Sequence, residues 1–186
     1  MLNFRYPFLS NPSMCFFIRK ENALNFTDEQ LLKLLLIEEY NSINALDEYK
    51  LKYERFFIVE SKNWIHIIDD NYGLDFTRNI KEILIDLGKT NEVFYCWIDD
   101  CGPYQFEWIY YKDGMLKRKY VVNTSDEIIE DYGIPLNGEK DALSLKDNLE
   151  KTCGIISSIG IDFNLLNIRG YEFFNPNDFI FNEEEY

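Results

Sequence analysis

Residues 104–122, with the sequence YQFEWIYYKDGMLKRKYVV, carry the strongest structural signal in this chain. Two segments rich in aromatic and β-branched residues flank the dipeptide Asp113-Gly114. Asp-Gly favours the two-residue turn of a β-hairpin, because both residues tolerate a positive φ. The pattern therefore predicts two antiparallel strands, over 104–111 and 115–122, joined by a tight turn.

The alternation of side chains predicts what these two strands face. Phe106, Trp108 and Tyr110 share one face of the first strand, and the other face mixes polar with apolar residues. In the second strand, one face carries Leu116, Arg118, Tyr120 and Val122, and the other carries Lys117, Lys119 and Val121. We therefore expect a sheet with one apolar face and one mixed face, with helices packed against it.

Further strands are predicted on the N-terminal side of this hairpin. Residues 92–98 read as a strand that leads into it, and residues 14–19 read as another short strand. Residues 55–60 and 64–69 are separated by a three-residue turn, which predicts a second hairpin.

Helices are predicted from their start signals and apolar spacing. Thr27 and Gln30 form a capping-box pattern, which predicts a helix over 28–40. Helical spacing predicts a second helix over 78–87 and a third over 145–159, with Ser144 as the N-cap of the third. Gly154 is expected to weaken that third helix.

These elements predict the fold class. We expect one α+β domain over residues 1–186, with a mostly antiparallel sheet of five or six strands covered by about three helices. The aromatic residues near the C-terminus are expected to dock on the body of the protein. The acidic end, Glu183-Glu184-Glu185, is expected to be solvated and frayed.

Charge and aromatic content together narrow the function. The chain has 33 acidic and 19 basic residues, a formal net charge of −14, and 17% aromatic residues. Acidic chains that lack aromatic residues remain disordered, because they cannot bury enough apolar surface to fold. The chain should therefore fold and present a negative surface, which excludes direct nucleic-acid binding and favours a basic protein partner.

Cysteine usage and hydropathy predict a cytoplasmic protein. The four cysteines, Cys15, Cys96, Cys101 and Cys153, are scattered and are expected to be reduced thiols. Cys96 and Cys101 do not have the paired spacing of zinc ligands, so we expect no metal site. No apolar run is long enough to span a bilayer, and the N-terminus does not resemble a secretory signal.

No catalytic motif is present in the sequence. His66 is the only histidine and lies within a predicted strand, between Ile65 and Ile67. It is either a general base or a half-buried structural histidine, and we favour the second interpretation. The chain has neither a Gly-x-Ser-x-Gly elbow nor a glycine-rich phosphate loop. We expect no enzymatic activity and no cofactor.

Clustered carboxylates give the candidate binding residues. Asp69-Asp70 and Asp99-Asp100 each end a strand, and adjacent strand residues point to opposite faces, so turn formation is favoured over metal binding. Residues 126–131 carry four carboxylates and form either a solvated loop or part of a docking surface. The partner-binding candidates are Asp99, Asp100, Asp126, Glu127, Glu130, Asp131 and Tyr111.

Part of the chain resembles a known group of proteins. The marks are Trp64, Asp69-Asp70, Asp99-Asp100-Cys101, Phe106-Glu107, Tyr110 to Gly114, an Arg-Lys-Tyr strand, and Tyr132-Gly133-x-Pro135-Leu136-x-Gly138-Glu139. This pattern resembles small bacterial cytoplasmic proteins of unassigned activity, some of which look like immunity proteins encoded beside polymorphic toxins. The resemblance carries over no functional residue.

The leading hypothesis is a non-enzymatic acidic immunity or inhibitor protein that neutralises a basic toxin. One alternative is an enzyme or small-molecule-binding protein with a pocket near His66. Another is a DNA mimic whose carboxylates are spaced like phosphates. A homo-oligomer formed through an exposed sheet face is compatible with all three hypotheses.

Overall fold

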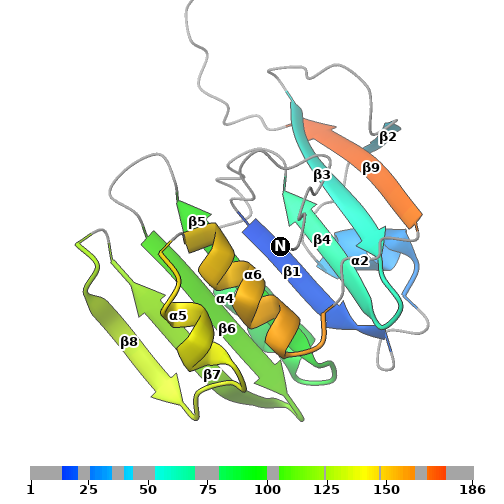
Figure 1. The fold of residues 1–186 in the computed structure, drawn as a ribbon. Helices are drawn as coiled ribbons and strands as arrows, with labels where there is room; N and C mark the ends of the chain where they lie inside the picture. Colours follow the sequence, from blue (N-terminus) through cyan, green and yellow to red (C-terminus); the bar gives the residue numbers. More distant parts are fainter. Residues whose placement is uncertain are drawn as a thin grey trace, which may run out of the picture.

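The computed structural model describes residues 14–20, 26–34, 40–43, 53–69, 80–99, 105–123, 125–146, 148–161 and 167–174. The described strands are β1 (Met14–Arg19), β2 (Asn41–Ile43), β3 (Tyr53–Glu60), β4 (Trp64–Asp69), β5 (Val93–Asp99), β6 (Gln105–Lys112), β7 (Met115–Val122), β8 (Ile128–Gly133) and β9 (Asn167–Phe174). The described helices are α2 (Asp28–Leu34), α4 (Ile80–Gly88), α5 (Glu139–Leu143) and α6 (Asn148–Ser158). The fold is α+β, as the sequence predicted (Figure 1).

All nine strands belong to one sheet, in the order β2-β9-β3-β4-β1-β5-β6-β7-β8. Every neighbouring pair is antiparallel. The expectation of five or six strands is therefore wrong, because the sequence patterns of β2, β8 and β9 do not predict strands. Two of the three contain charged residues, and β2 is only three residues long. Pairing with a neighbouring strand outweighs such weak local propensity.

The hairpin at residues 104–122 is confirmed. Lys112 pairs with Met115, and the two residues between them both have positive φ, 54° at Asp113 and 69° at Gly114. This is the type I′ geometry that matches the twist of the flanking strands. The second predicted hairpin, β3 with β4, is also confirmed.

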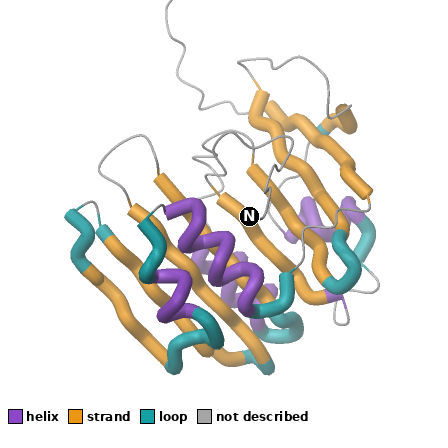
Figure 2. Tube along the Cα trace, in the orientation of Figure 1, coloured by secondary structure: helices purple, strands orange, loops and turns teal. Residues whose placement is uncertain are grey.

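Helices cover both faces of the sheet, α2 and α4 on one and α5 and α6 on the other (Figure 2). The α2–α4 core comprises Phe16, Ile18, Leu31, Leu32, Phe56, Ile58, Ile65, Ile67, Ile83, Leu84, Leu87, Val93, Tyr95 and Tyr171. The α5–α6 core comprises Cys15, Phe17, Phe57, Val59, Trp64, Phe94, Cys96, Phe106, Trp108, Tyr110, Tyr120, Val122, Ala142, Ile155, Ile156 and Ile161.

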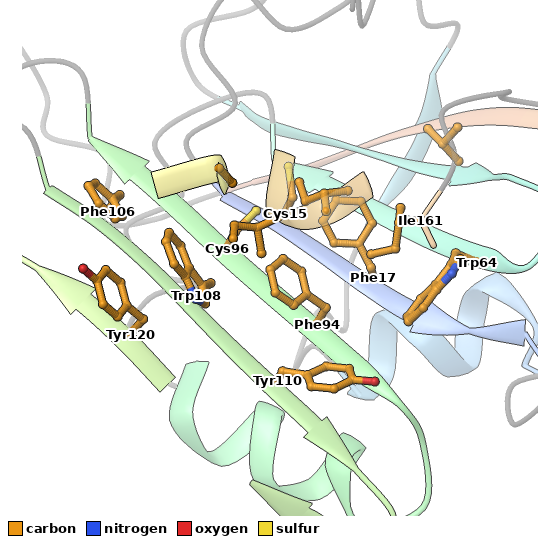
Figure 3. Close-up of a cluster of buried hydrophobic side chains, with 14 of the residues drawn as sticks. Cys15, Phe17, Trp64, Phe94, Cys96, Phe106, Trp108, Tyr110, Tyr120 and Ile161 are labelled. Carbon is orange, nitrogen blue, oxygen red and sulfur yellow. The ribbon is translucent and has the colours of Figure 1, made fainter. Parts of the chain in front are cut away.

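The expected mixed face is therefore found only towards β6 and β7, whereas the middle of the sheet is apolar on both sides. Aromatic rings fill the α5–α6 core at the β6–β7 end (Figure 3). The Trp108 ring stacks on Tyr120 with centroids 4.7 Å apart and on Phe106 at 5.3 Å. Rings at these separations add attraction beyond the apolar area that they bury.

The capping box at the start of α2 is confirmed. The backbone N–H of Thr27 donates to the side chain of Gln30 at 2.9 Å, and the Gln30 N–H donates to the Thr27 hydroxyl at 3.3 Å. The expected role of Ser144 is wrong, because it is the C-cap of α5 and its hydroxyl donates to the carbonyl of Asp141. The additional helix α5 covers residues 139–143, for which the sequence pattern predicts no element.

Candidate functional site at the acidic edge of the sheet

The acidic segment 126–131 leads into and forms most of β8, the outermost strand of the sheet. Residues 128–133 pair with β7, no second neighbouring strand is found in the described part of the chain, and all six residues are exposed. Of the two alternatives for this segment, the solvated loop is therefore wrong for residues 128–131, which are in a strand. Glutamate and aspartate disfavour strands, but the β7 backbone supplies hydrogen bonds that hold these residues extended.

Four apolar side chains accompany these carboxylates. Ile128, Ile129 and Tyr132 are each 56% exposed, and Ile134, just beyond the strand, is 85% exposed. A single exposed apolar residue is ordinary on a protein surface, but four within seven positions are an unusual concentration of exposed apolar side chains along one edge. We call residues 126–134 the acidic edge.

The turn that precedes β8 is ordered by Asn123. Its side-chain oxygen accepts hydrogen bonds from the backbone N–H groups of Ser125 at 2.8 Å and Glu127 at 2.9 Å. Its amide donates to the Glu127 carboxylate at 3.1 Å, and Asp126 adopts a positive φ of 58°. These bonds hold the first two carboxylates of the acidic edge in a defined turn.

A buried arginine ties β8 to the rest of the protein. Arg118 on β7 is 1% exposed, and its Nε donates to both carboxylate oxygens of Glu139 at 3.1 and 3.0 Å. Its Nη1 donates to the Tyr132 carbonyl at 2.9 Å and to the Asp131 carboxylate. The network thus joins β7, β8 and α5.

The same network determines the charge state of Arg118. Burial acts to lower the pKa of Arg118, but hydrogen bonds to Glu139 and Asp131 outweigh burial and raise its pKa above the ordinary value. Glu139 also accepts a hydrogen bond from the backbone N–H of Leu136 at 2.9 Å. Because a buried ion pair is stable only when its remaining polar atoms are bonded, this arrangement keeps both charges in place.

The Gly-x-Pro-Leu-x-Gly-Glu segment, residues 133–139, contains two glycines whose positions in the structure require that residue type. Gly133 has φ of 88°, and a Cβ atom there would lie 2.0 Å from the Lys117 carbonyl oxygen. Gly138 has φ of 76° and is the N-cap of α5, directly before Glu139. The segment therefore shapes the end of β8 and delivers the Glu139 carboxylate to Arg118.

The carboxylates of the acidic edge differ in their pairing. Glu130 forms an ion pair with Lys119 at 2.8 Å, and Lys119 lies 3.9 Å from Glu107. Burial, opposed by Lys119 and helped by the Glu130 charge, raises the pKa of Glu107. Within the described part of the chain, Asp126 and Glu127 form no ion pair, so their charges remain available at the surface.

Of the other predicted partner-binding residues, Tyr111 does not join this edge. Tyr111 lies on β6, half-buried against the α2–α4 core, and burial raises its pKa. Its ring packs where Gly88 ends α4, since a Cβ atom on that glycine would lie 2.6 Å from the ring. Asp99 ends β5, but its side chain and the whole of Asp100 lie outside the described residues.

His66 is a core residue and is 0% exposed. Its Nε2 lies 3.1 Å from the Ser61 hydroxyl, and its ring meets Phe17 edge-on with centroids 4.9 Å apart. Burial lowers the pKa of His66 from 6.5 to about 3. These observations favour the structural interpretation of this histidine, although it is fully buried rather than half-buried.

The depressed pKa of His66 predicts the pH dependence of its contribution to folding. The unfolded imidazole takes up a proton near pH 6.5, whereas the folded one resists protonation down to about pH 3. Stability is therefore fully present above pH 6.5 and is lost as pH falls, at up to about 1.4 kcal/mol per pH unit.

The single histidine makes this prediction easy to measure, because only one imidazole Hε1 signal appears in the NMR spectrum. We expect no titration of that signal between pH 8 and pH 5 in the folded chain. In urea the same signal should titrate near pH 6.5. A folded-state midpoint near 6.5 would contradict the buried, neutral imidazole.

A polar surface depression of about 350 Å³ lies away from His66. It is formed by residues at the end of α4 and at the β6–β7 turn, among them Lys89, Asn91 and Lys112. Its lining combines these lysines with the carboxylates of Glu92 and Asp113. Because the lining carries both signs of charge, it favours neither anionic nor cationic ligands.

Three of the thiols are described, and these three form no disulfide. Cys15 on β1 and Cys96 on β5 are buried register partners, and Cys153 is partly exposed. A hydrogen bond to Cys15, together with burial, raises the pKa of Cys96. Cys101 lies outside the described residues.

Among the described residues, no three histidine, cysteine, aspartate or glutamate side chains gather as a metal-ligand set. The helices in the same part of the chain are all too short or too polar to cross a membrane. Comparison of the chain with protein-family models, curated proteins and solved structures found no match.

Sequence reasoning missed the groups that organise the site. Arg118 shares a strand face with Tyr120 and Val122, and a lone arginine on such an aromatic face is a signal for a buried ion pair. Its partner, Glu139, directly follows a glycine of the motif quoted above. The exposed isoleucines were overlooked because the carboxylates beside them dominate the segment.

Proposed function

We propose that this chain is a non-enzymatic binding protein for a basic protein partner, and in its most specific form an immunity or inhibitor protein that neutralises a basic toxin. The observation that carries the proposal is the acidic edge, where exposed carboxylates lie beside exposed isoleucines and a tyrosine on an outermost strand. Such a surface combines charge attraction with apolar contact area.

The net charge of −14 supports the same proposal. A negative field speeds the encounter with a basic partner and disfavours acidic ones, and it contributes more to association rate than to final affinity. Tyr132, whose ring is amphipathic and exposed, belongs to the residue types that most often dominate binding energy. For a toxin that acts on nucleic acid, covering its basic substrate site would suffice for inhibition.

The test uses the purified product of the reading frame next to the gene for this chain. We expect a complex whose association rate falls steeply between about 50 mM and 500 mM salt, because screening weakens long-range attraction. Co-expression of this chain should also protect cells from that product. Absence of a complex, or a complex without protection, would remove the immunity proposal.

Neither alternative receives comparable support. A small-molecule site at His66 would need access to a side chain that is 0% exposed. A DNA mimic would need an uninterrupted ridge of carboxylates, whereas Lys119 and Arg118 pair with carboxylates of the acidic edge itself.

A further inference from the structure

We propose that the outer side of β8 binds an extended basic segment of the partner as an additional strand of the sheet. The inference rests on the proposed function for the charge of the partner, and it adds the location and the mode of binding. It follows from the backbone, the side chains and the charge of one strand.

Among the described strands, none pairs with the outer side of the β8 backbone. A strand at the margin of a sheet presents N–H and C=O groups that another chain can pair with, and such edges are usually shortened or carry lysine or proline. The opposite edge, β2, is three residues long, whereas β8 has six residues and neither lysine nor proline. Strand addition to such an edge is a common way of binding peptides.

The geometry of β8 defines where pairing can occur. The register with β7 is regular from Glu130 to Gly133 and shifts at Val121/Val122, which leaves Ile129 as an extra residue on β8. A bulge bends the strand locally and re-aims its side chains. We therefore assign residues 130–133 to backbone pairing and the two isoleucines before them to apolar contact.

The negative charges of β8 disfavour a second copy of this strand and favour a basic segment. Antiparallel pairing of two β8 strands about the Glu130–Asp131 position would place Glu130 opposite Asp131 of the second copy, and like charges directly opposite are destabilising. A segment with lysine or arginine at alternate positions would instead place its cations on one face of the sheet, beside one of these two carboxylates. Asp126 and Glu127, which form no ion pair among the described residues, extend the attraction beyond the strand.

The buried network prepares this edge before binding. Arg118 bonds to the Tyr132 carbonyl and to Asp131, so the strand is held in place from its inner side. An edge that is already ordered loses less conformational entropy when a partner strand is added.

The probe is a synthetic ten-residue peptide of alternating lysine and valine, added to the full-length chain at low salt. We expect slower hydrogen exchange at alternate backbone amides of residues 130–133. A peptide of alternating glutamate and valine should leave exchange unchanged. The variants Ile129→Lys and Tyr132→Lys should each weaken binding of the basic peptide at least tenfold.

Met115→Lys is the matched control. Met115 is 54% exposed, close to the 56% of Ile129, and it lies at the start of β7, outside β8. The Met115→Lys substitution introduces the same charge as the two β8 variants. It should leave the affinity for the basic peptide within twofold of that of the unaltered chain. Thermal unfolding of each variant checks that the fold is intact.

The outcomes separate this inference from the proposed function. Absence of peptide binding, protection spread over other strands, or equal weakening by Met115→Lys would overturn strand addition at β8. If the neighbouring gene product binds and the β8 variants leave that binding unchanged, the proposed function stands and the edge inference falls. If the peptide protects β8 and the gene product does not bind, the edge inference stands and the immunity role falls.

Discussion

Replacing Arg118 with methionine will lower the free energy of unfolding by about 3–5 kcal/mol. The guanidinium is 1% exposed and bonds to Glu139, Asp131 and the Tyr132 carbonyl. Its removal leaves the Glu139 carboxylate buried without its cationic partner, which costs far more than an exposed ion pair contributes. Chemical denaturation of the variant and the unaltered chain measures the difference.

A second variant makes this prediction specific to the ion pair. Arg118→Met combined with Glu139→Met removes both charges and should recover most of the lost stability, because apolar residues of similar volume often replace a buried pair at little cost. A double variant that is as unstable as the sum of the two single variants would show that the network is not coupled. Hydrogen exchange should show β8 opening first in the single variant.

Replacing Gly133 with alanine will lower the free energy of unfolding by about 3 kcal/mol or more. The glycine has φ of 88°, which disfavours any other residue, and its Cβ position lies 2.0 Å from the Lys117 carbonyl oxygen. That oxygen belongs to the backbone of β7, so it cannot move aside without disturbing the β7–β8 pairing. Denaturation midpoints at constant m-value give the change.

Gly160 is the matched control for this substitution. Its φ is 80°, close to that of Gly133, but nothing lies within 4 Å of its Cβ position. Gly160→Ala should therefore cost only the conformational penalty, about 1 kcal/mol. Equal losses for the two variants would mean that backbone conformation alone, and not the approach of β7, requires glycine at 133.

Arg118→Met and Gly133→Ala should also affect binding. These two substitutions disturb the contacts that support β8 and leave its outer side unchanged. A folded variant with a loosened edge must order that edge when a partner strand binds. We therefore expect weaker binding of the basic peptide even where the exposed carboxylates and isoleucines are retained.

Local features of the chain could be predicted from the sequence. The Asp113-Gly114 turn requires positive φ at two adjacent residues, and the capping box requires a hydroxyl and an amide three residues apart. Both conditions involve only neighbours along the chain, so the residue types suffice to recognise them. The strands of the two hairpins were predicted for the same reason, to within one or two residues.

Elements that depend on distant partners could not be predicted. Strand β9 follows α6 in the chain yet lies between β2 and β3, and β8 is a strand because β7 is beside it. Ser144 has the residue type of an N-cap, but its position places it at the end of α5 instead. In each case residue type permits several structures and pairing selects one.

The sequence by itself determined the turns, the main hairpins, the strongly negative charge and the presence of enough apolar residues to fold. These properties depend on local backbone preferences and on composition, which are the same in any tertiary arrangement. Only the tertiary structure decided that both faces of the sheet are buried, that Arg118 meets Glu139, and that the acidic segment is an exposed edge. Those facts depend on which segments meet in space. Burial and strand pairing decide whether a charged side chain lies in a buried ion pair or is exposed and available for binding.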